Sequence, residues 1–150
     1  YTAYLFRQAK GREMWQAKYL PLHMGIQSLI SGSSICIIMV TAFGMLKKSY
    51  DFSVSVFVFG LVMSGMIIGI EHVVNRRMSG PVRIANRHLI SGKYKLWFWI
   101  GVIIVGHVFP MMVLLIETSF IALLCGLSAL CGLYCYEYGF VMSAQDVPNS

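Results

Sequence analysis

Polar side chains that can carry a proton lie at the borders of long apolar stretches, where such groups are costly to bury. His23 opens the first stretch, and Glu71 and His72 close the second. Glu137 lies about five residues before the end of the last stretch. An ionisable group in the middle of a membrane costs roughly 2.5–3.5 kcal/mol on insertion scales. Together with Gln27, these residues predict a partly hydrated pocket suited to moving a proton or to hydrogen-bonding a quinone carbonyl.

His107 lies deeper than these residues, about eleven residues into the third stretch and near its middle. Pro110 follows one turn later and, because it lacks an N–H, leaves a backbone carbonyl free near the imidazole. The candidates for a proton path are Glu71, His107 and Glu137. The candidates for a quinone pocket are His23, Gln27 and His72. No catalytic residue is expected in this chain.

A structural interpretation of the same residues stays open. In it, His23, Glu71 and His72 mark the boundary with water. Glu137 then extends its carboxylate to the surface, and His107 hydrogen-bonds a neighbouring helix.

The histidines and cysteines do not predict a metal or haem site. Two axial ligands of a haem must lie at similar depth, whereas His23 and His107 differ by roughly 15 Å along a helix. A pair of His23 and His72 would place the haem among the headgroups. The cysteines all lie inside apolar stretches without a Cys-x-x-Cys motif, so neither zinc nor a disulfide framework is expected. They are Cys36, Cys125, Cys131 and Cys135.

The composition excludes a water-soluble globule as the first interpretation. Hydrophobic residues make up 57% of the 150 residues and charged residues 12%, with a mean hydropathy of +0.70. Soluble domains average roughly 45–50% apolar and about 25% charged residues. The net charge of +6 lies between the apolar stretches, so it favours a role in membrane topology over binding of nucleic acid.

Four apolar stretches are long enough to cross a membrane as helices, since a hydrocarbon core of about 30 Å needs about 20 residues. The predicted spans are 19–46, 52–70, 96–116 and 118–142. Residues 1–18 form an amphipathic lead-in and residues 143–150 a tail. Strands are not expected, because the stretches are continuous rather than alternating. We therefore predict an all-α, integral membrane four-helix bundle.

The charges predict that both termini lie in the cytoplasm. The N-terminal segment carries four basic residues and the link between the second and third spans carries six. The opposite side has only Lys47 and Lys48, and the last link has only Glu117. Basic loops stay in the cytoplasm, so the chain is expected in the cytoplasmic (inner) membrane.

Small residues predict where the helices pack closely. They include a Gly65-x-x-x-Gly69 pattern. The positions are Ser28, Gly32 and Cys36 in the first span, Gly60, Ser64, Gly65 and Gly69 in the second, and Gly126, Ser128 and Gly132 in the fourth. Aromatic residues from Trp15 to Tyr138, among them Tyr134 and Tyr136, are interpreted as an anchoring belt at the cytoplasmic interface.

Three segments together resemble a known family. From Tyr1 the chain reads YTAYLFRQAKGREMWQAKYLPLH, from Gly80 it reads GPVRIANRHLISGKYKLWFWIGVIIVGHVFP, and from Tyr136 it reads YEYGFVMSAQDVPNS. Their order and spacing are similar to the C-terminal half of the polysulfide reductase membrane subunit family (NrfD/PsrC). At the last motif this chain has Ala144-Gln145 where Gly-Gln is commoner in the family, a change expected to alter packing more than chemistry.

The resemblance implies a membrane anchor that exchanges electrons between a quinone, menaquinone or ubiquinone, and an iron-sulfur partner subunit. It also implies an N-terminal bundle before this segment, or a homologous membrane subunit, and allows for a molybdopterin catalytic subunit. No haem or metal is implied in this chain. We predict a quinone and proton-conduit subunit of a respiratory oxidoreductase. The alternatives are a small secondary transporter or ion-conducting bundle, and a purely structural anchor.

Overall fold

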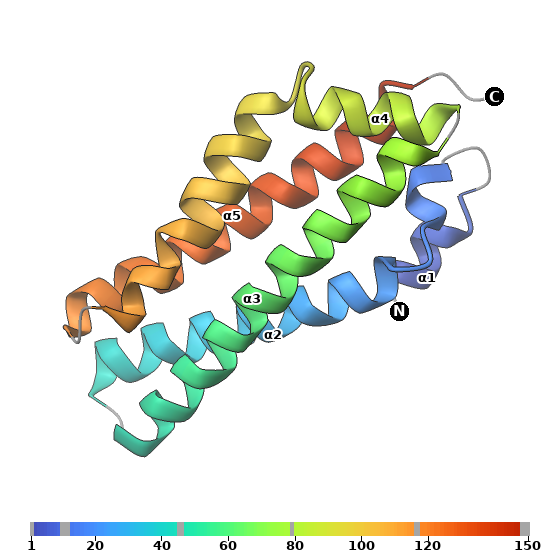
Figure 1. Ribbon diagram of the computed structural model, residues 1–150. Helices are drawn as coiled ribbons and strands as arrows, with labels where there is room; N and C mark the ends of the chain where they lie inside the picture. The colour runs from blue at the N-terminus through green and yellow to red at the C-terminus, as the bar shows by residue number, and fades with distance from the viewer. Residues whose placement is uncertain (1, 10–12, 45–46, 79, 116–117, 148–150) are drawn as a thin grey trace.

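Every element in the described part of the chain is a helix, as expected for an all-α protein (Figure 1). The computed structural model describes residues 2–9, 13–44, 47–78, 80–115 and 118–147. In chain order the elements are α1 (Thr2–Arg7), η1 (Glu13–Gln16), α2 (Leu20–Phe43), α3 (Lys47–Arg77), α4 (Pro81–Ile90), η2 (Trp97–Val108), η3 (Pro110–Leu114) and α5 (Ser119–Gln145).

Three helices among the described residues are long and apolar enough to cross a membrane, namely α2, α3 and α5. The predicted third span takes a different form. Its first part, η2, is a π-helix and its second part, η3, is a 3-10 helix. The apolar helix there runs only from Trp97 to Met112. Four spans, and the orientation with both termini in the cytoplasm, therefore stay predictions.

Pro110 explains where the π-helix stops. The N–H of Phe109 donates to the carbonyl of Ile104, five residues earlier, over 2.9 Å. Proline has no N–H and cannot continue that ladder. The next bonded turn is the tighter one, from the N–H of Met112 to the carbonyl of Phe109.

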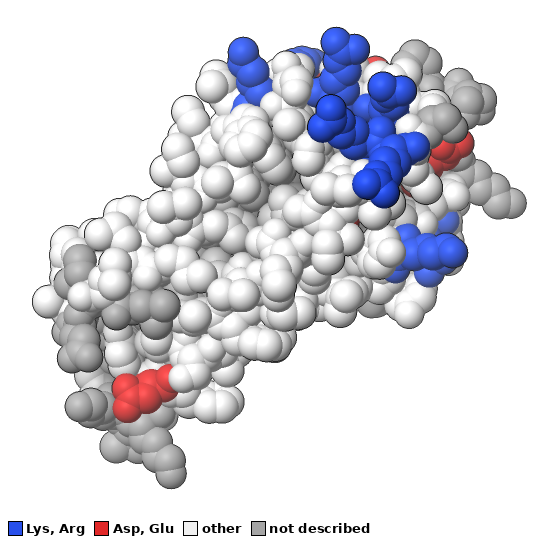
Figure 2. Space-filling model, viewed as in Figure 1, with Lys and Arg blue, Asp and Glu red and all other residues white. Residues whose placement is uncertain are grey.

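The long helices lie side by side, with the chain ends at one end of the bundle (Figure 1). α2 packs on α3 and on α5, and α5 packs on η2. α4 also lies at the end that holds the termini, and Figure 2 shows lysine and arginine side chains gathered there. The side chains of Lys47 and Lys48, and Glu117 as a whole, lie outside the described residues.

α4 is a helix that the sequence analysis treated only as a basic link. Pro81 lies in its first turn, where a missing N–H has no cost. Val82, Ala85 and Leu89 are buried at helical spacing. These apolar side chains fold the link onto the end of the bundle, so its arginines point outward.

Close packing occurs at several of the predicted glycines. A Cβ atom on Gly132 would lie 2.1 Å from the Cα atom of Gly106, so α5 and η2 touch backbone to backbone. A Cβ atom on Gly60 would lie 2.8 Å from the Ile30 side chain. A Cβ atom on Gly126 would lie 3.2 Å from the Ser34 carbonyl.

The expected packing face of the first span makes no close helix contact among the described residues. Gly32 and Cys36 are exposed, and α2 packs instead through Ser34 and Ile37 on its other side. A Cβ atom on Gly65 would lie 3.8 Å from the His107 ring of η2, whereas a Cβ atom on Gly69 would meet no other described atom within 4 Å. Only the first glycine of Gly65-x-x-x-Gly69 therefore faces a neighbouring helix among the described residues. Spacing alone did not reveal which face of the helix points inward.

The buried core has two parts. The terminal-end core lies towards the chain ends and includes Leu20, Ile68, Ala85, Leu89, Tyr94, Phe98, Tyr136 and Phe140. The hairpin-end core lies towards the tips of the two hairpins and includes Ile30, Ile37, Phe57, Leu61, Ala122, Cys125 and Ala129.

Candidate functional site

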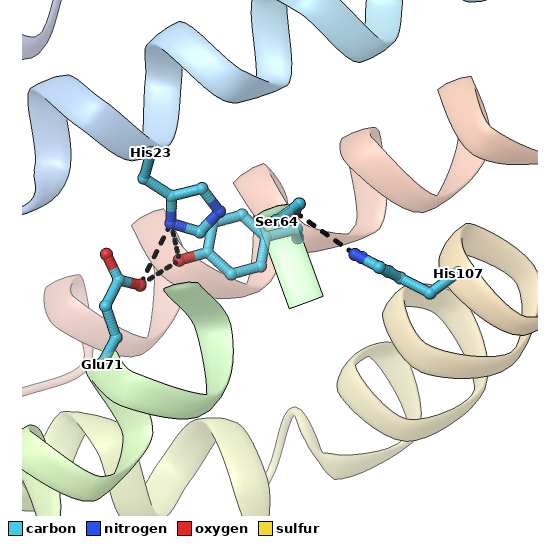
Figure 3. A network of polar contacts seen from close by, with 5 residues as sticks. His23, Ser64, Glu71 and His107 are labelled. Carbon is cyan, nitrogen blue, oxygen red and sulfur yellow. Dashed lines mark hydrogen bonds and ion pairs between the residues drawn. The ribbon is translucent and has the colours of Figure 1, made fainter. Parts of the chain in front are cut away.

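Three helices each contribute one polar side chain to a buried cluster in the terminal-end half (Figure 3). His23 comes from α2, Glu71 from α3 and Tyr136 from α5. The Tyr136 hydroxyl donates to Glu71 Oε2 over 3.0 Å. His23 Nδ1 lies 3.1 Å from the same oxygen and 3.1 Å from Tyr136 Oη. We call these three residues the polar cluster.

The polar cluster is nearly shielded from solvent. The His23 side chain is 1% exposed and the Glu71 side chain is 12% exposed. His23 Nε2 is buried and has no hydrogen-bond partner among the described residues. Leaving a buried polar atom unpaired costs about 1–3 kcal/mol. The free nitrogen is therefore a point at which a water molecule or another hydrogen-bonding group is favoured.

Local helix geometry sets the position of each member. His23 follows Pro21 in the first turn of α2, and its backbone N–H donates to the carbonyl of Tyr19. The Tyr136 ring stacks on Phe140 one turn later, with centroids 5.9 Å apart, and lies 4.6 Å from the His23 ring. Packing against these rings holds the hydroxyl towards α3.

A small cavity with a mixed polar and apolar lining adjoins the cluster. It encloses about 20 Å³, which is room for about one water molecule. Its lining includes Glu71, His72, Asn75, Asn86 and Tyr136, with Leu89 and Phe98 on the apolar side. His72 Nδ1 lies 3.3 Å from Asn86 Oδ1, which ties α3 to α4 at this point. The cavity can hydrate Glu71 from the end of the bundle that carries the basic residues.

His107 makes a separate polar contact deeper in the bundle (Figure 3). Its Nδ1 lies 2.8 Å from the carbonyl of Val102, so this nitrogen carries the proton and donates. In the neutral ring Nε2 is then an acceptor, and it lies 3.2 Å from the Ser64 hydroxyl of α3. This is the interhelical hydrogen bond that the structural interpretation of His107 predicted.

The structure brings some of the predicted residues together and leaves others apart. His23 and Glu71 are in contact, and His72 lines the adjoining cavity. Gln27 is buried on α2, and Glu137 lies beside it, partly exposed.

Tyr136 was predicted to belong to the anchoring belt, and its place in the polar cluster was not predicted. An available signal was its depth. Tyr136 precedes Glu137 inside an apolar helix, about as far from the basic end as Glu71 is on α3. A buried tyrosine hydroxyl needs a partner, and at that depth the partner is another helix.

Outside the long helices, Lys93, Tyr94 and Asp146 tie the start of η2 to the end of α5. Lys93 Nζ and Tyr94 Oη donate to Asp146 Oδ2 over 2.9 and 2.8 Å. The bonds from Lys93 and then Tyr94 lower the pKa of Asp146 below its ordinary 3.8. The bond to Asp146 raises the pKa of Lys93. Burial is the main cause that raises the pKa of Tyr94.

No group of three or more His, Cys, Asp or Glu side chains suited to a metal ion occurs within the described part of the chain. The polar groups that do meet are one carboxylate, one imidazole and one phenol. Such a set can bind, orient and pass on a proton.

Long apolar helices around a buried polar cluster, with the basic residues at one end, define a multi-pass helical membrane protein. The family model of the polysulphide reductase NrfD matches residues 1–149, and the chain belongs to that family. Neither a curated protein nor a solved structure matches the chain. Membership makes the chain a membrane subunit of the respiratory oxidoreductase type.

Proposed function

We propose that the chain is the membrane anchor and proton-conduit subunit of a quinone-linked respiratory oxidoreductase that exchanges electrons with an iron-sulfur partner subunit. In this proposal both termini, and the basic end of the bundle, face the cytoplasm. The single observation that supports the conduit most strongly is the polar cluster, with its unpaired His23 Nε2.

The proposed route begins at the basic end. A water molecule in the cavity delivers a proton to the Glu71 carboxylate, which faces both the cavity and His23. In the neutral tautomer that carries its proton on Nε2, His23 accepts the proton from Glu71 at Nδ1 and passes the Nε2 proton to a water molecule bound at that nitrogen. Tyr136 donates to Glu71 and keeps the carboxylate directed at His23. Ser64 and His107 are the next polar groups inward.

The fit of a quinone to this site is limited by space. A cavity of about 20 Å³ accepts about one water molecule and excludes a quinone ring. In the proposed route, the cavity therefore carries protons and does not hold the quinone. A quinone supplies two-electron, two-proton chemistry when bound, and the assignment of His23, Gln27 and His72 to its pocket stays a prediction.

The test uses the assembled complex in its native membrane, with proton uptake followed by a pH-sensitive dye during quinol-linked turnover. Glu71→Gln and Tyr136→Phe are expected to slow proton-coupled turnover at least about tenfold, because a positioned acid or base contributes more than that. Tyr134→Phe is the matched control, since Tyr134 lies on the same helix and is 65% exposed.

Two outcomes would contradict the proposal. One is unchanged turnover and proton uptake in both cluster variants, with normal assembly, which would leave a structural anchor. The other is purification of the tagged chain without iron-sulfur clusters, together with pH-dependent ion uptake by the chain alone. That result would favour a transporter.

A further inference from the structure

The end of the bundle that carries α4 has a dense group of basic side chains (Figure 2). We call part of this group the basic face. It consists of those exposed members that form no ion pair among the described residues, namely Arg76, Arg77, Arg83, Arg87 and Lys95, whereas the exposed Lys93 is paired with Asp146. The side-chain ion pairs found in the described residues join His23 to Glu71 and Lys93 to Asp146, so neither involves this face. The basic face thus holds positive charge that no described acidic residue neutralises.

Two hydrogen bonds fix the orientation of α4. His72 on α3 contacts Asn86, and the Trp99 indole N–H donates to the carbonyl of Ile90 over 3.0 Å. With its apolar side buried against the bundle, α4 turns Arg83 and Arg87 outward, one helical turn apart. The two guanidinium groups therefore belong to a fixed surface.

An exposed apolar strip begins where the basic face ends. Leu96 follows Lys95 directly in the chain and is 63% exposed. Trp99, Ile100 and Ile104 continue the exposed surface along η2. Because Trp99 is bonded to the end of α4, the strip starts beside the helix that bears the arginines.

From this arrangement we propose that the basic face binds the headgroup of an anionic phospholipid whose acyl chains lie along the exposed strip of η2. A phospholipid joins an anionic phosphate to two hydrocarbon chains. The phosphate matches the basic face, and the chains match the apolar strip that begins beside it. An exposed tryptophan beside basic residues is typical of the headgroup level of a bilayer. An acidic protein would match the arginines but would make no use of the apolar strip that adjoins them.

Arginine fits this role because its planar guanidinium binds phosphate through two parallel hydrogen bonds. Attraction between one basic side chain and an anionic membrane surface corresponds to about fivefold in affinity. Neutralising both Arg83 and Arg87 is therefore expected to weaken binding at least about tenfold.

The experiment is native mass spectrometry of the purified complex in detergent, titrated with dioleoyl-phosphatidylglycerol and, separately, with dioleoyl-phosphatidylcholine. We expect tighter binding of phosphatidylglycerol, and a loss of at least about tenfold in the double variant Arg83→Gln, Arg87→Gln. The control with the same loss of charge is Arg7→Gln, Lys18→Gln, since both residues lie outside the basic face and neither is buried. The control is expected to bind phosphatidylglycerol within about twofold of the original protein.

Further arms distinguish the alternatives. Inorganic phosphate should compete only weakly, because it lacks the chains that contact η2. The proposal is overturned if phosphatidylcholine binds equally well, or if the two double variants lose affinity equally. It is also overturned if a polyglutamate peptide binds the basic face and phosphatidylglycerol does not, which would identify an acidic protein as the partner.

Discussion

The two halves of the bundle bury polar groups in different ways. In the hairpin-end half, buried serines bond to their own helix. Ser34 donates to the carbonyl of Ile30 over 2.7 Å, and Ser53 donates to that of Ser49 over 2.8 Å. In the terminal-end half, His23, Asn86 and Tyr136 bond to side chains of other helices, whereas Ser143 bonds to its own helix.

This difference separates packing from function. A serine that bonds to its own backbone needs no neighbouring helix, and it lets two helices approach closely. A buried carboxylate that contacts an imidazole and a phenol depends on both partners. Loss of either side chain leaves a buried polar group unpaired, which lowers stability. We interpret the hairpin-end half as scaffold and the terminal-end half as the part that acts on protons.

The largest predicted effect is on the scaffold contact between α5 and η2. Gly132→Ala places a Cβ atom 2.1 Å from a backbone atom of Gly106, so the helices must move apart. We expect the free energy of unfolding to fall by at least about 1–3 kcal/mol. The measurement is thermal unfolding in detergent. Gly69→Ala is the control, since nothing lies within 4 Å there. Equal stability of the two variants would contradict the close contact.

The second prediction concerns the stability of the polar cluster. Tyr136→Phe removes the hydroxyl that donates to Glu71 and leaves a buried carboxylate with one donor fewer. A loss of about 1–3 kcal/mol in unfolding free energy is expected from an unsatisfied buried acceptor. Tyr134→Phe should be neutral. A neutral Tyr136→Phe would show that the hydroxyl does not serve the carboxylate.

The third prediction compares two buried serines directly. Ser64→Ala leaves His107 Nε2 without its partner on α3 and should cost about 1 kcal/mol, within the range of interhelical hydrogen bonds in membranes. Ser34→Ala removes a bond within one helix and should cost less than about 0.5 kcal/mol. The measurement is equilibrium unfolding in mixed micelles. The reverse order would contradict the distinction between a hydrogen bond that joins two helices and one that stays within a helix.

The smallest expected effect is the pH dependence of the tie between Lys93 and Asp146. Because the folded-state pKa of Asp146 is lowered, the tie stabilises the end of α5 above about pH 4 and is lost as pH falls through the lowered value. The raised pKa of Lys93 keeps the tie intact past about pH 10. The protection factors of residues 141–147 against hydrogen exchange, corrected for the intrinsic rate at each pH, should fall in acid. In Asp146→Asn the protection should be lower already at neutral pH, and unchanged protection would contradict the tie.

Much of the architecture follows from hydropathy. Uninterrupted apolar stretches predicted the helices that became α2, α3 and α5, because only a helix satisfies its own backbone in lipid. Pro21 lies in the first turn of α2, where its missing N–H has no cost. The contact between His23 and Glu71 agrees with the expectation that polar residues at the basic ends of different helices meet.

Other features could not be predicted from the sequence, because they depend on packing between segments that lie far apart in the chain. The close approach of η2 to α5 joins Gly106 and Gly132, which lie far apart in the sequence, and neither glycine alone predicts that contact. α4 depends on three apolar residues that do not stand out among the arginines. Tyr136 was assigned to the interface because tyrosine is common there, and only its neighbours on α2 and α3 reveal its partners.

The central claim is that the terminal-end half holds a hydrated polar cluster joined across three helices. It is tested most directly by an experimental density map of the assembled complex in lipid, at a resolution that reveals ordered water. The account predicts His23, Glu71 and Tyr136 in mutual contact, one water molecule in the cavity beside Glu71 and a polar atom within hydrogen-bonding distance of His23 Nε2. Separated side chains, or an apolar group filling the space beside Nε2, would contradict it.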